Sequence, residues 1–215
     1  MRIARVEIEH FRGIRKAKLL FPRHGVLIGD NNTGKTTILE ALDLVLGPDR
    51  LNRQPAIDEH DFFRGIYTKP DVPPKTEEGG APPALGEEAA EVLTPKIVIE
   101  ATIADLTEEQ KGKFGDYIEF WDSATDNFYD APDPAGVDAH SITEALRITF
   151  HGWYDKEEDD FEGATYFTRS LTESDKPALF SKKHKQLCGF LYLRSIRTGS
   201  RALSLVVRSI KTNTY

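Results

Sequence analysis

Eight consecutive residues near the N-terminus carry the strongest chemical signal in the sequence. Gly29, Gly34, Lys35 and Thr36 occupy the fixed positions of the pattern G-x-x-x-x-G-K-[ST]. The two glycines permit a tight loop whose backbone N–H groups surround phosphate oxygens, and the lysine places an ammonium against the β- and γ-phosphates. The threonine hydroxyl is a ligand for the Mg²⁺ that bridges those phosphates. The loop therefore predicts a site for ATP and Mg²⁺.

The segments on both sides of this loop fit the same interpretation. Val26–Ile28 is an apolar run that predicts a buried strand ending at the loop. Lys35–Leu46 places isoleucine, leucine and valine at helical spacing and is followed by Gly47-Pro48, a common helix stop. The N-terminus of that helix adds the positive end of its dipole to the same anion site.

Further elements follow from periodicity. Alternating apolar residues predict two strands before the loop, at 3–11 and 17–21, with turns at 12–13 and 23–25. Strands are also expected at 96–104, 145–154, 164–169 and 190–194. A helix is expected to begin near 106–110, where Thr107 and Gln110 have the spacing of a capping box. Two segments rich in proline and glycine, at about 69–95 and 125–139, predict a mobile acidic insertion and a loop.

Composition excludes several classes of protein. The chain has 215 residues, of which 39% are hydrophobic and 29% charged, and its mean hydropathy is −0.44. It contains no apolar run long enough to cross a bilayer and begins with charged residues, so we expect no membrane partner and a cytoplasmic location. The single cysteine, Cys188, is expected to be a small buried apolar residue without a chemical role.

The net charge of −7 is distributed unevenly. Residues 1–55 carry +4, residues 56–168 carry −19 and residues 169–215 carry +8. The basic tract Lys182–Arg208, with Arg194, Arg197 and Arg201, contacts DNA phosphates, serves a subunit interface or is simply solvated. The sequence does not separate these three interpretations.

Several of these segments resemble a known family. Asn31-Asn32 within the loop and the strand ending at 10–13 resemble the start of ABC-type ATPases related to RecF and SMC proteins. Within that group, 57–63 and 190–205 resemble the OLD (overcoming lysogenization defect) family of ATP-dependent nucleases.

The resemblance implies an α/β fold: a P-loop NTPase with a mixed sheet, a helix behind the phosphate loop and an antiparallel β lobe. It also implies ATP hydrolysis coupled to DNA nuclease activity in the complete protein, and a homodimer. It allows Arg12 to lie over the adenine or to reach a phosphate, and an ordinary turn arginine is the alternative. The expected nucleotide-binding residues are thus Gly29, Asp30, Asn31, Asn32, Thr33, Gly34, Lys35, Thr36, Thr37 and Arg12, with Thr36 as the metal ligand.

Other parts of the ABC-type machinery have no match in the sequence. No Ser-Gly-Gly signature segment and no apolar strand ending in Asp-Glu, the Walker B strand, is found, and 118–122 and 42–47 are the nearest candidates for the latter. The nuclease module also has no counterpart, so the chain is interpreted as the N-terminal lobe of a longer protein, and we expect it to bind ATP without completing catalysis.

Two other functions share the phosphate loop. A RecF- or SMC-like clamp would use ATP for dimerisation on DNA without cutting it. A small-molecule kinase would normally follow the loop with a compact lid, whereas the following region here is acidic and rich in loop residues. We therefore rank the kinase last.

Two further groups of residues were considered as sites. Asp58, Glu59, His60 and Asp61 bring together three carboxylates and an imidazole, groups that can bind a divalent cation. At most two of these adjacent side chains can point to one site, so a solvated loop is the favoured interpretation. Trp121, Trp153 and Tyr154 lie among apolar neighbours and are expected in the core rather than on a base-stacking surface.

Overall fold

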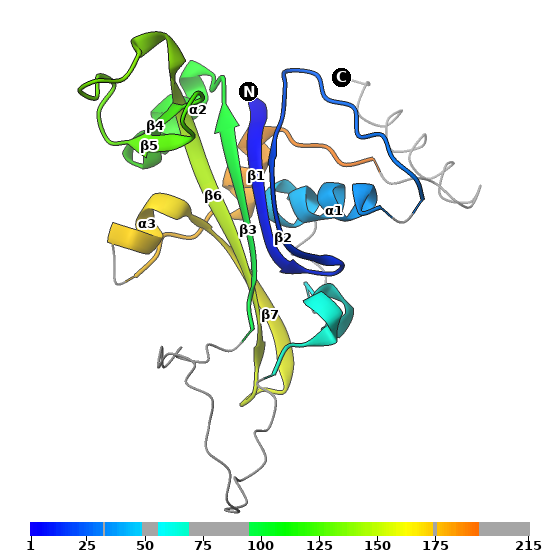
Figure 1. The fold of residues 1–215 in the computed structure, drawn as a ribbon. Coiled ribbons are helices and arrows are strands. Elements are labelled where there is room, and N and C mark those ends of the chain that lie inside the picture. Colours follow the sequence, from blue (N-terminus) through cyan, green and yellow to red (C-terminus); the bar gives the residue numbers. More distant parts are fainter. Residues whose placement is uncertain (32, 49–55, 69–94, 174–175, 194–215) are drawn as a thin grey trace, which may run out of the picture.

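The computed structural model describes residues 1–31, 33–48, 56–68, 95–173 and 176–193. Within these ranges the chain builds one twisted sheet with helices packed around it (Figure 1). The strands are β1 (Arg2–Phe11), β2 (Ile14–Leu20), β3 (Ile97–Ala104), β4 (Ile118–Asp122), β5 (Asn127–Tyr129), β6 (Ile142–Asp155) and β7 (Asp160–Phe167). The α-helices are α1 (Lys35–Leu46), α2 (Glu108–Phe114), α3 (Thr168–Glu173) and α4 (Lys182–Cys188). Four short 3₁₀ turns are η2 (Glu59–Asp61), η3 (Phe63–Gly65), η4 (Gly115–Tyr117) and η5 (Ala139–Ser141).

The sheet has the strand order β2-β1-β3-β6-β4-β5, and β7 also pairs with β6. Every strand pair among the described residues is antiparallel. The long strand β6 is central, because Ile142–Leu146 pairs with β4 and Ile148–Asp155 pairs with β7 along the same edge. The predicted antiparallel lobe is confirmed, whereas the predicted mixed sheet is not present in the described residues.

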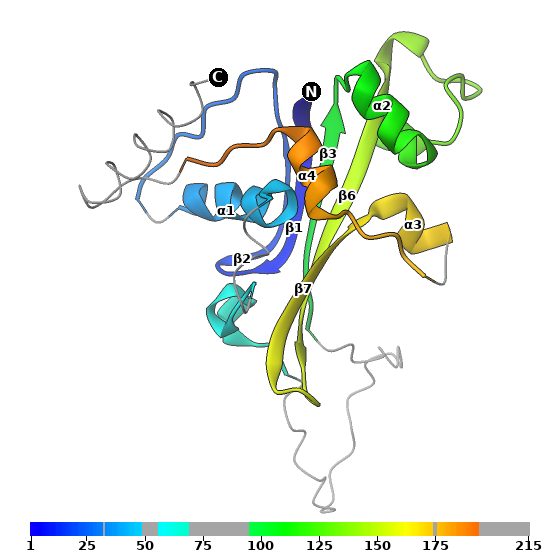
Figure 2. The same cartoon turned by 180° about the vertical axis from the view of Figure 1, so that it is seen from behind.

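One face of the sheet is apolar and carries the helix that follows the phosphate loop. Val6 and Ile8 of β1 and Ile99 of β3 are fully buried on this face. Helix α1 packs against them through residues such as Leu44 and Val45, and α4 lies on the same side of the sheet (Figures 1 and 2). Burial of each such side chain contributes about 1.5–3 kcal/mol relative to exposure. The core therefore fixes α1, and with it the loop from which α1 starts.

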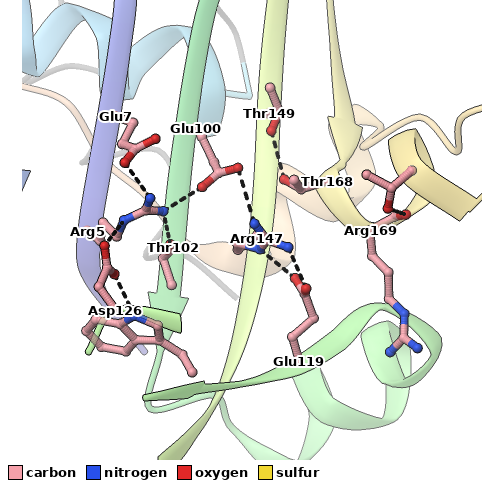
Figure 3. Close-up of polar contacts among 12 residues, drawn as sticks. Arg5, Glu7, Glu100, Thr102, Glu119, Asp126, Arg147, Thr149, Thr168 and Arg169 are labelled. Atoms are coloured by element: carbon pink, nitrogen blue, oxygen red, sulfur yellow. Dashed lines mark hydrogen bonds and ion pairs between the residues drawn. The ribbon is translucent and has the colours of Figure 1, made fainter. Parts of the chain in front are cut away.

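The opposite face of the sheet is charged, and its charges pair with one another (Figure 3). Arg5 on β1 contacts Glu7 at 2.5 Å, Glu100 on β3 at 2.5 Å and Asp126 in the β4–β5 turn at 3.1 Å. Arg147 on β6 donates two hydrogen bonds to Glu119 on β4, at 2.5 and 2.7 Å. Burial and the neighbouring carboxylates act in opposite directions on Arg147, and its pKa is raised overall. These ion pairs and hydrogen bonds thus tie β4 and the β4–β5 turn to the central strands.

Two glycines face each other across β6 and β7. Gly152 is paired with Gly163. The ring of Phe150 fills the space that a side chain would occupy at Gly163, and Ile57 together with that ring fills it at Gly152. A Cβ built on Gly163 would lie 2.5 Å from Cζ of Phe150, well inside van der Waals contact. The absence of side chains here allows the aromatic core to extend to the end of the sheet.

Gly163→Ala is therefore expected to lower the free energy of unfolding by at least about 1 kcal/mol, because the buried Phe150 ring has to move. Denaturant unfolding followed by circular dichroism measures this. Gly112→Ala in α2 is the matched control, since a Cβ there meets nothing within 4 Å and alanine favours the helix. Equal destabilisation by the two changes would contradict the proposed packing.

Several predicted elements are confirmed. Helix 35–46, strand 3–11 and strand 96–104 correspond to α1, β1 and β3 within one residue at each end. Thr107 and Gln110 form the predicted capping box at the start of α2. Trp121 and Cys188 are buried as predicted, while Trp153 and Tyr154 are only half-buried.

Two predicted strands are wrong. Val26–Ile28 is not a strand, and its Val26 and Ile28 side chains are 82% and 90% exposed. The last backbone hydrogen bond of the β1–β2 pair runs from the N–H of Phe21 to the oxygen of Ala4. Pro22 follows and has no N–H to continue the pairing. Residues 190–193 are likewise not a strand, since none of the described strands pairs with them after Gly189 ends α4.

Other boundaries also differ from the predictions. The strand predicted at 164–169 ends at Phe167, where α3 begins. The loop predicted at 125–139 contains the short strand β5. The insertion predicted at 69–95 lies outside the described residues except for Pro95.

Candidate functional site

The phosphate loop lies at the start of α1 and folds around its own lysine. Nζ of Lys35 donates hydrogen bonds to the backbone oxygens of Gly29 and Asp30, at 2.7 and 2.6 Å, and lies 3.2 Å from Oγ1 of Thr33. Oγ1 of Thr33 in turn donates to the oxygen of Asp30, at 2.8 Å. The ammonium is therefore held inside the loop.

The two glycines are needed for this loop conformation. Gly34 has φ +87°, a left-handed value that residues with a side chain rarely adopt. A Cβ on Gly29 would lie 3.0 Å from Oγ1 of Thr33, so a side chain there would crowd the loop. Glycine at these two positions thus permits the tight turn that leads into α1.

The N-terminus of α1 is open to an anion. Gly34 is its N-cap and supplies no side-chain cap, and no acidic residue lies in the first turn. The first N–H groups of the helix therefore keep their partial positive charge. Thr36 and Thr37 lie in this turn, with Thr36 exposed and Thr37 half-buried. Asn31 is exposed in the turn before it, and Asn32 lies outside the described residues.

Arg12 belongs to a second cluster on the side of α1. It lies in the turn between β1 and β2 with φ +51°, and its backbone N–H donates to the oxygen of Asp61, at 2.8 Å. Its guanidinium donates to Oδ1 of Asp61 at 2.8 Å and forms an ion pair with Glu40 of α1. Arg12 is therefore engaged with two carboxylates, and no hydrogen bond or ion pair joins it to the described residues of the loop.

The acidic segment 58–61 has a structural role in the protein. Oδ1 of Asp58 accepts the N–H of His60 at 2.8 Å, and Oδ2 of Asp61 accepts the N–H of Asp58 at 3.2 Å, which together cap η2. Asp61 is only 3% exposed and faces Arg12, while Glu59 and His60 are exposed. No cluster of three metal-ligating side chains occurs in the part of the chain that the structure describes. The cation site weighed as one interpretation of 58–61 is therefore not formed among the described residues.

The basic tract is only partly described. Lys182, Lys183 and Lys185 lie on α4, whereas Arg194, Arg197, Arg201 and Arg208 lie outside the described residues. Lys185 is fully buried, and its Nζ donates to the oxygen of Leu44 in the last turn of α1, at 2.8 Å. It therefore stabilises the C-terminal end of the helix that begins at the phosphate loop.

Sequence reasoning missed two residues of this region. Glu40 pairs with Arg12, 28 positions earlier in the chain, and Lys185 donates to α1 at Leu44, 141 positions earlier. Neither Glu40 nor Lys185 belongs to a local motif. Their roles become visible only when the tertiary contacts are known. None of the described helices is long and apolar enough to cross a membrane.

Comparison with known proteins agrees with this geometry. The uncharacterized protein YbjD of Escherichia coli (strain K12) is 47% identical over 49 residues, which span 23% of this chain and 9% of that protein. The sequence pattern of the AAA ATPase domain matches residues 1–187, which include the phosphate loop and all the described helices and strands except the last residue of α4. The chain therefore belongs to the AAA ATPase domain family, whose members are P-loop proteins that bind and hydrolyse ATP.

Proposed function

We propose that the loop Gly29–Thr36 binds the triphosphate of MgATP and that the complete protein uses ATP hydrolysis to act on DNA. The observation that carries the first part is the position of the Lys35 ammonium, held by Gly29 and Asp30 inside a loop that opens onto an uncapped helix N-terminus. Backbone dipoles, helix dipole and ammonium all favour an anion at this one place.

The loop residues have separate tasks in this proposal. Lys35 pairs with the β- and γ-phosphates, and backbone N–H groups between Gly29 and Gly34 surround the phosphate oxygens. Thr36 supplies its hydroxyl to Mg²⁺, whose chemical contribution is to neutralise charge on the phosphates. Thr36 is exposed at the second position of α1, so its hydroxyl is accessible to a metal ion.

Binding should depend on Mg²⁺ through Thr36. MgATP is expected to raise the melting temperature of the protein, by the mass-action effect of a ligand that binds only the native state. Thr36→Ala should retain binding of ATP without metal but lose most of the gain that Mg²⁺ provides. Thermal unfolding with ATP, in Mg²⁺ and in EDTA, measures this, and Thr33→Ala is the control because its hydroxyl bonds within the loop. An equal Mg²⁺ effect in parent and Thr36→Ala would exclude Thr36 as the ligand.

For the complete protein we propose a homodimeric, ATP-dependent DNA nuclease of the OLD type. The basis is the resemblance of 57–63 and 190–205 to that family and of 10–13 to the wider RecF- and SMC-related group, together with membership of an ATPase family. The matched segment covers 9% of the YbjD chain, so that relative supports no more than a local similarity.

DNA is accordingly expected to stimulate ATP hydrolysis by the full-length protein, and Mg²⁺-dependent DNA cleavage is expected to require ATP. A steady-state ATPase assay with and without DNA, paired with a gel assay for cleavage, measures both. Stimulation without any cleavage would contradict the nuclease part and favour an ATP-driven clamp. No stimulation would contradict the DNA-directed function as a whole.

A further inference from the structure

The arginines of the described chain differ sharply in their partners. Six of the eight form an ion pair with a carboxylate, namely Arg2, Arg5, Arg12, Arg23, Arg147 and Arg169. Arg15 and Arg64 form none with any described residue, although the protein as a whole is acidic. Both line the same cavity.

This cavity has a volume of about 310 Å³ and is bounded by two kinds of side chain. His10, Arg15 and Arg64 supply the polar wall, and Phe63, Ile66 and Pro95 supply the apolar wall. No acidic side chain is among the described residues that line it. The guanidinium of Arg64 lies over the ring of Phe63, 5.2 Å from its centre, so the two walls meet at a cation–aromatic pair.

Two turns distant in sequence are held together to form the cavity. Phe11 at the end of β1 forms a β-bridge with Phe62. The backbone N–H of Arg12 donates a hydrogen bond to the backbone oxygen of Asp61, at 2.8 Å. His10 and Arg15 belong to the hairpin on one side of this junction, and Arg64 belongs to η3 on the other.

The backbone at the cavity is strained. His10 has φ +55° and Arg64 has φ +58°, which are left-handed values uncommon for residues with a side chain. Such conformations cost of order 1–3 kcal/mol each and persist where surrounding contacts enforce them, often at binding sites. The backbone that carries His10 and Arg64 is therefore held in an uncommon conformation at the edge of the cavity.

We propose that this cavity is a second nucleotide site, separate from the phosphate loop, which binds the phosphate of a nucleotide unit through Arg15 and Arg64 and packs its base against Phe63 and Ile66. Paired guanidinium groups match phosphate oxygens, and an aromatic ring beside an arginine suits a stacked base. The same chemistry is offered by a free mononucleotide and by one nucleotide of a single strand. Both this cavity and the phosphate loop are proposed to bind nucleotides. Binding in the cavity does not depend on ATP binding to the loop.

The test uses two ligands and protein in which the phosphate loop is disabled by Lys35→Ala. Fluorescence anisotropy measures binding of a labelled single-stranded oligo(dT) of about twelve nucleotides, with AMP as competitor. The pocket variant is Arg15→Ala combined with Arg64→Gly, since glycine accepts the left-handed backbone at position 64 without strain. Arg23→Ala is the matched control, because it removes one exposed arginine outside the cavity.

The pocket variant should bind the oligonucleotide at least tenfold more weakly than the Lys35→Ala parent, and Arg23→Ala should bind within twofold of it. The slope of log affinity against log salt should become shallower by about 0.7, for one lost phosphate contact on a single strand. Competition by AMP would identify the free nucleotide as the ligand, and binding of the oligonucleotide without competition would identify the strand. Arg15→Ala alone, which leaves η3 unchanged, should show part of the loss and unfold at the temperature of its parent.

Three results would overturn the proposal. The first is the absence of oligonucleotide and AMP binding by the Lys35→Ala protein. The second is an equal loss of affinity in Arg23→Ala and in the pocket variant, which would indicate general charge attraction. The third comes from calorimetry with MgATP on protein with an intact phosphate loop: if the pocket variant loses as much ATP affinity as Lys35→Ala does, the cavity is part of the ATP site. Failure of the phosphate loop to bind ATP would instead affect only the proposed function.

Discussion

Lowering the pH from about 9 to about 7 is expected to reduce the free energy of unfolding by about 2 kcal/mol through one buried lysine. Lys185 is fully buried between α4 and α1, and burial lowers its pKa from 10.5 to about 7. The nearby charge of Asp43 acts in the opposite direction but is outweighed. In this pH range the unfolded chain therefore holds a proton on Lys185 that the native chain has released.

The direction of the effect follows from that difference in bound protons. Because the unfolded state binds more protons between about pH 7 and the ordinary lysine pKa, falling pH favours unfolding in that window. Below about pH 7 both states are protonated and this contribution becomes constant. Cys188, whose pKa burial raises from 9.0 to about 11, acts in the opposite direction only above about pH 9.

Lys185→Met is the informative change, because methionine preserves much of the side-chain volume and cannot titrate. Urea unfolding at three pH values between about 7 and 9 should show that the free energy of unfolding of the parent rises with pH. The free energy of unfolding of Lys185→Met should stay nearly constant. Lys183→Met, an exposed position on the same helix, should behave like the parent. If parent and Lys185→Met show the same pH dependence, Lys185 does not change protonation state in this range.

The parts of the fold that were predictable are those determined by local sequence. Lys35–Leu46 forms a helix because its apolar residues repeat at helical spacing and Gly34 can adopt a left-handed start. Thr107 and Gln110 cap α2 through bonds that span three residues. The loop pattern likewise lies within eight consecutive residues, which is why the sequence alone identified it.

What could not be predicted depends on partners far along the chain. Val26–Ile28 has the composition of a strand, but no described strand pairs with it, and composition alone does not reveal this. Ile118–Asp122 was considered only as a motif for Mg²⁺ and is instead β4, paired with β5 and β6. Arg12 was assigned to the nucleotide, whereas Glu40 and Asp61 engage it.

The spatial arrangement of the basic side chains is the clearest feature that the sequence alone does not predict. Counting charges along the sequence draws attention to the tract Lys182–Arg208, yet Lys185 of that tract is buried and serves α1. Arg15 and Arg64 are separated by 49 positions and do not stand out in the sequence. They are brought together by the Phe11–Phe62 bridge.

The central claim is that the loop Gly29–Thr36 binds ATP through Lys35, and isothermal titration calorimetry with MgATP tests it most directly. Replacing Lys35 by alanine removes the ammonium that the loop oxygens of Gly29 and Asp30 hold in position. A charge-assisted contact of this kind contributes roughly 2 kcal/mol or more, so affinity should fall by at least about tenfold. Lys16→Ala, an exposed lysine on β2 away from the loop, is the matched control and should bind like the parent. The account predicts MgATP binding that is weakened in Lys35→Ala and unchanged in Lys16→Ala, whereas equal affinity of Lys35→Ala and parent would contradict it.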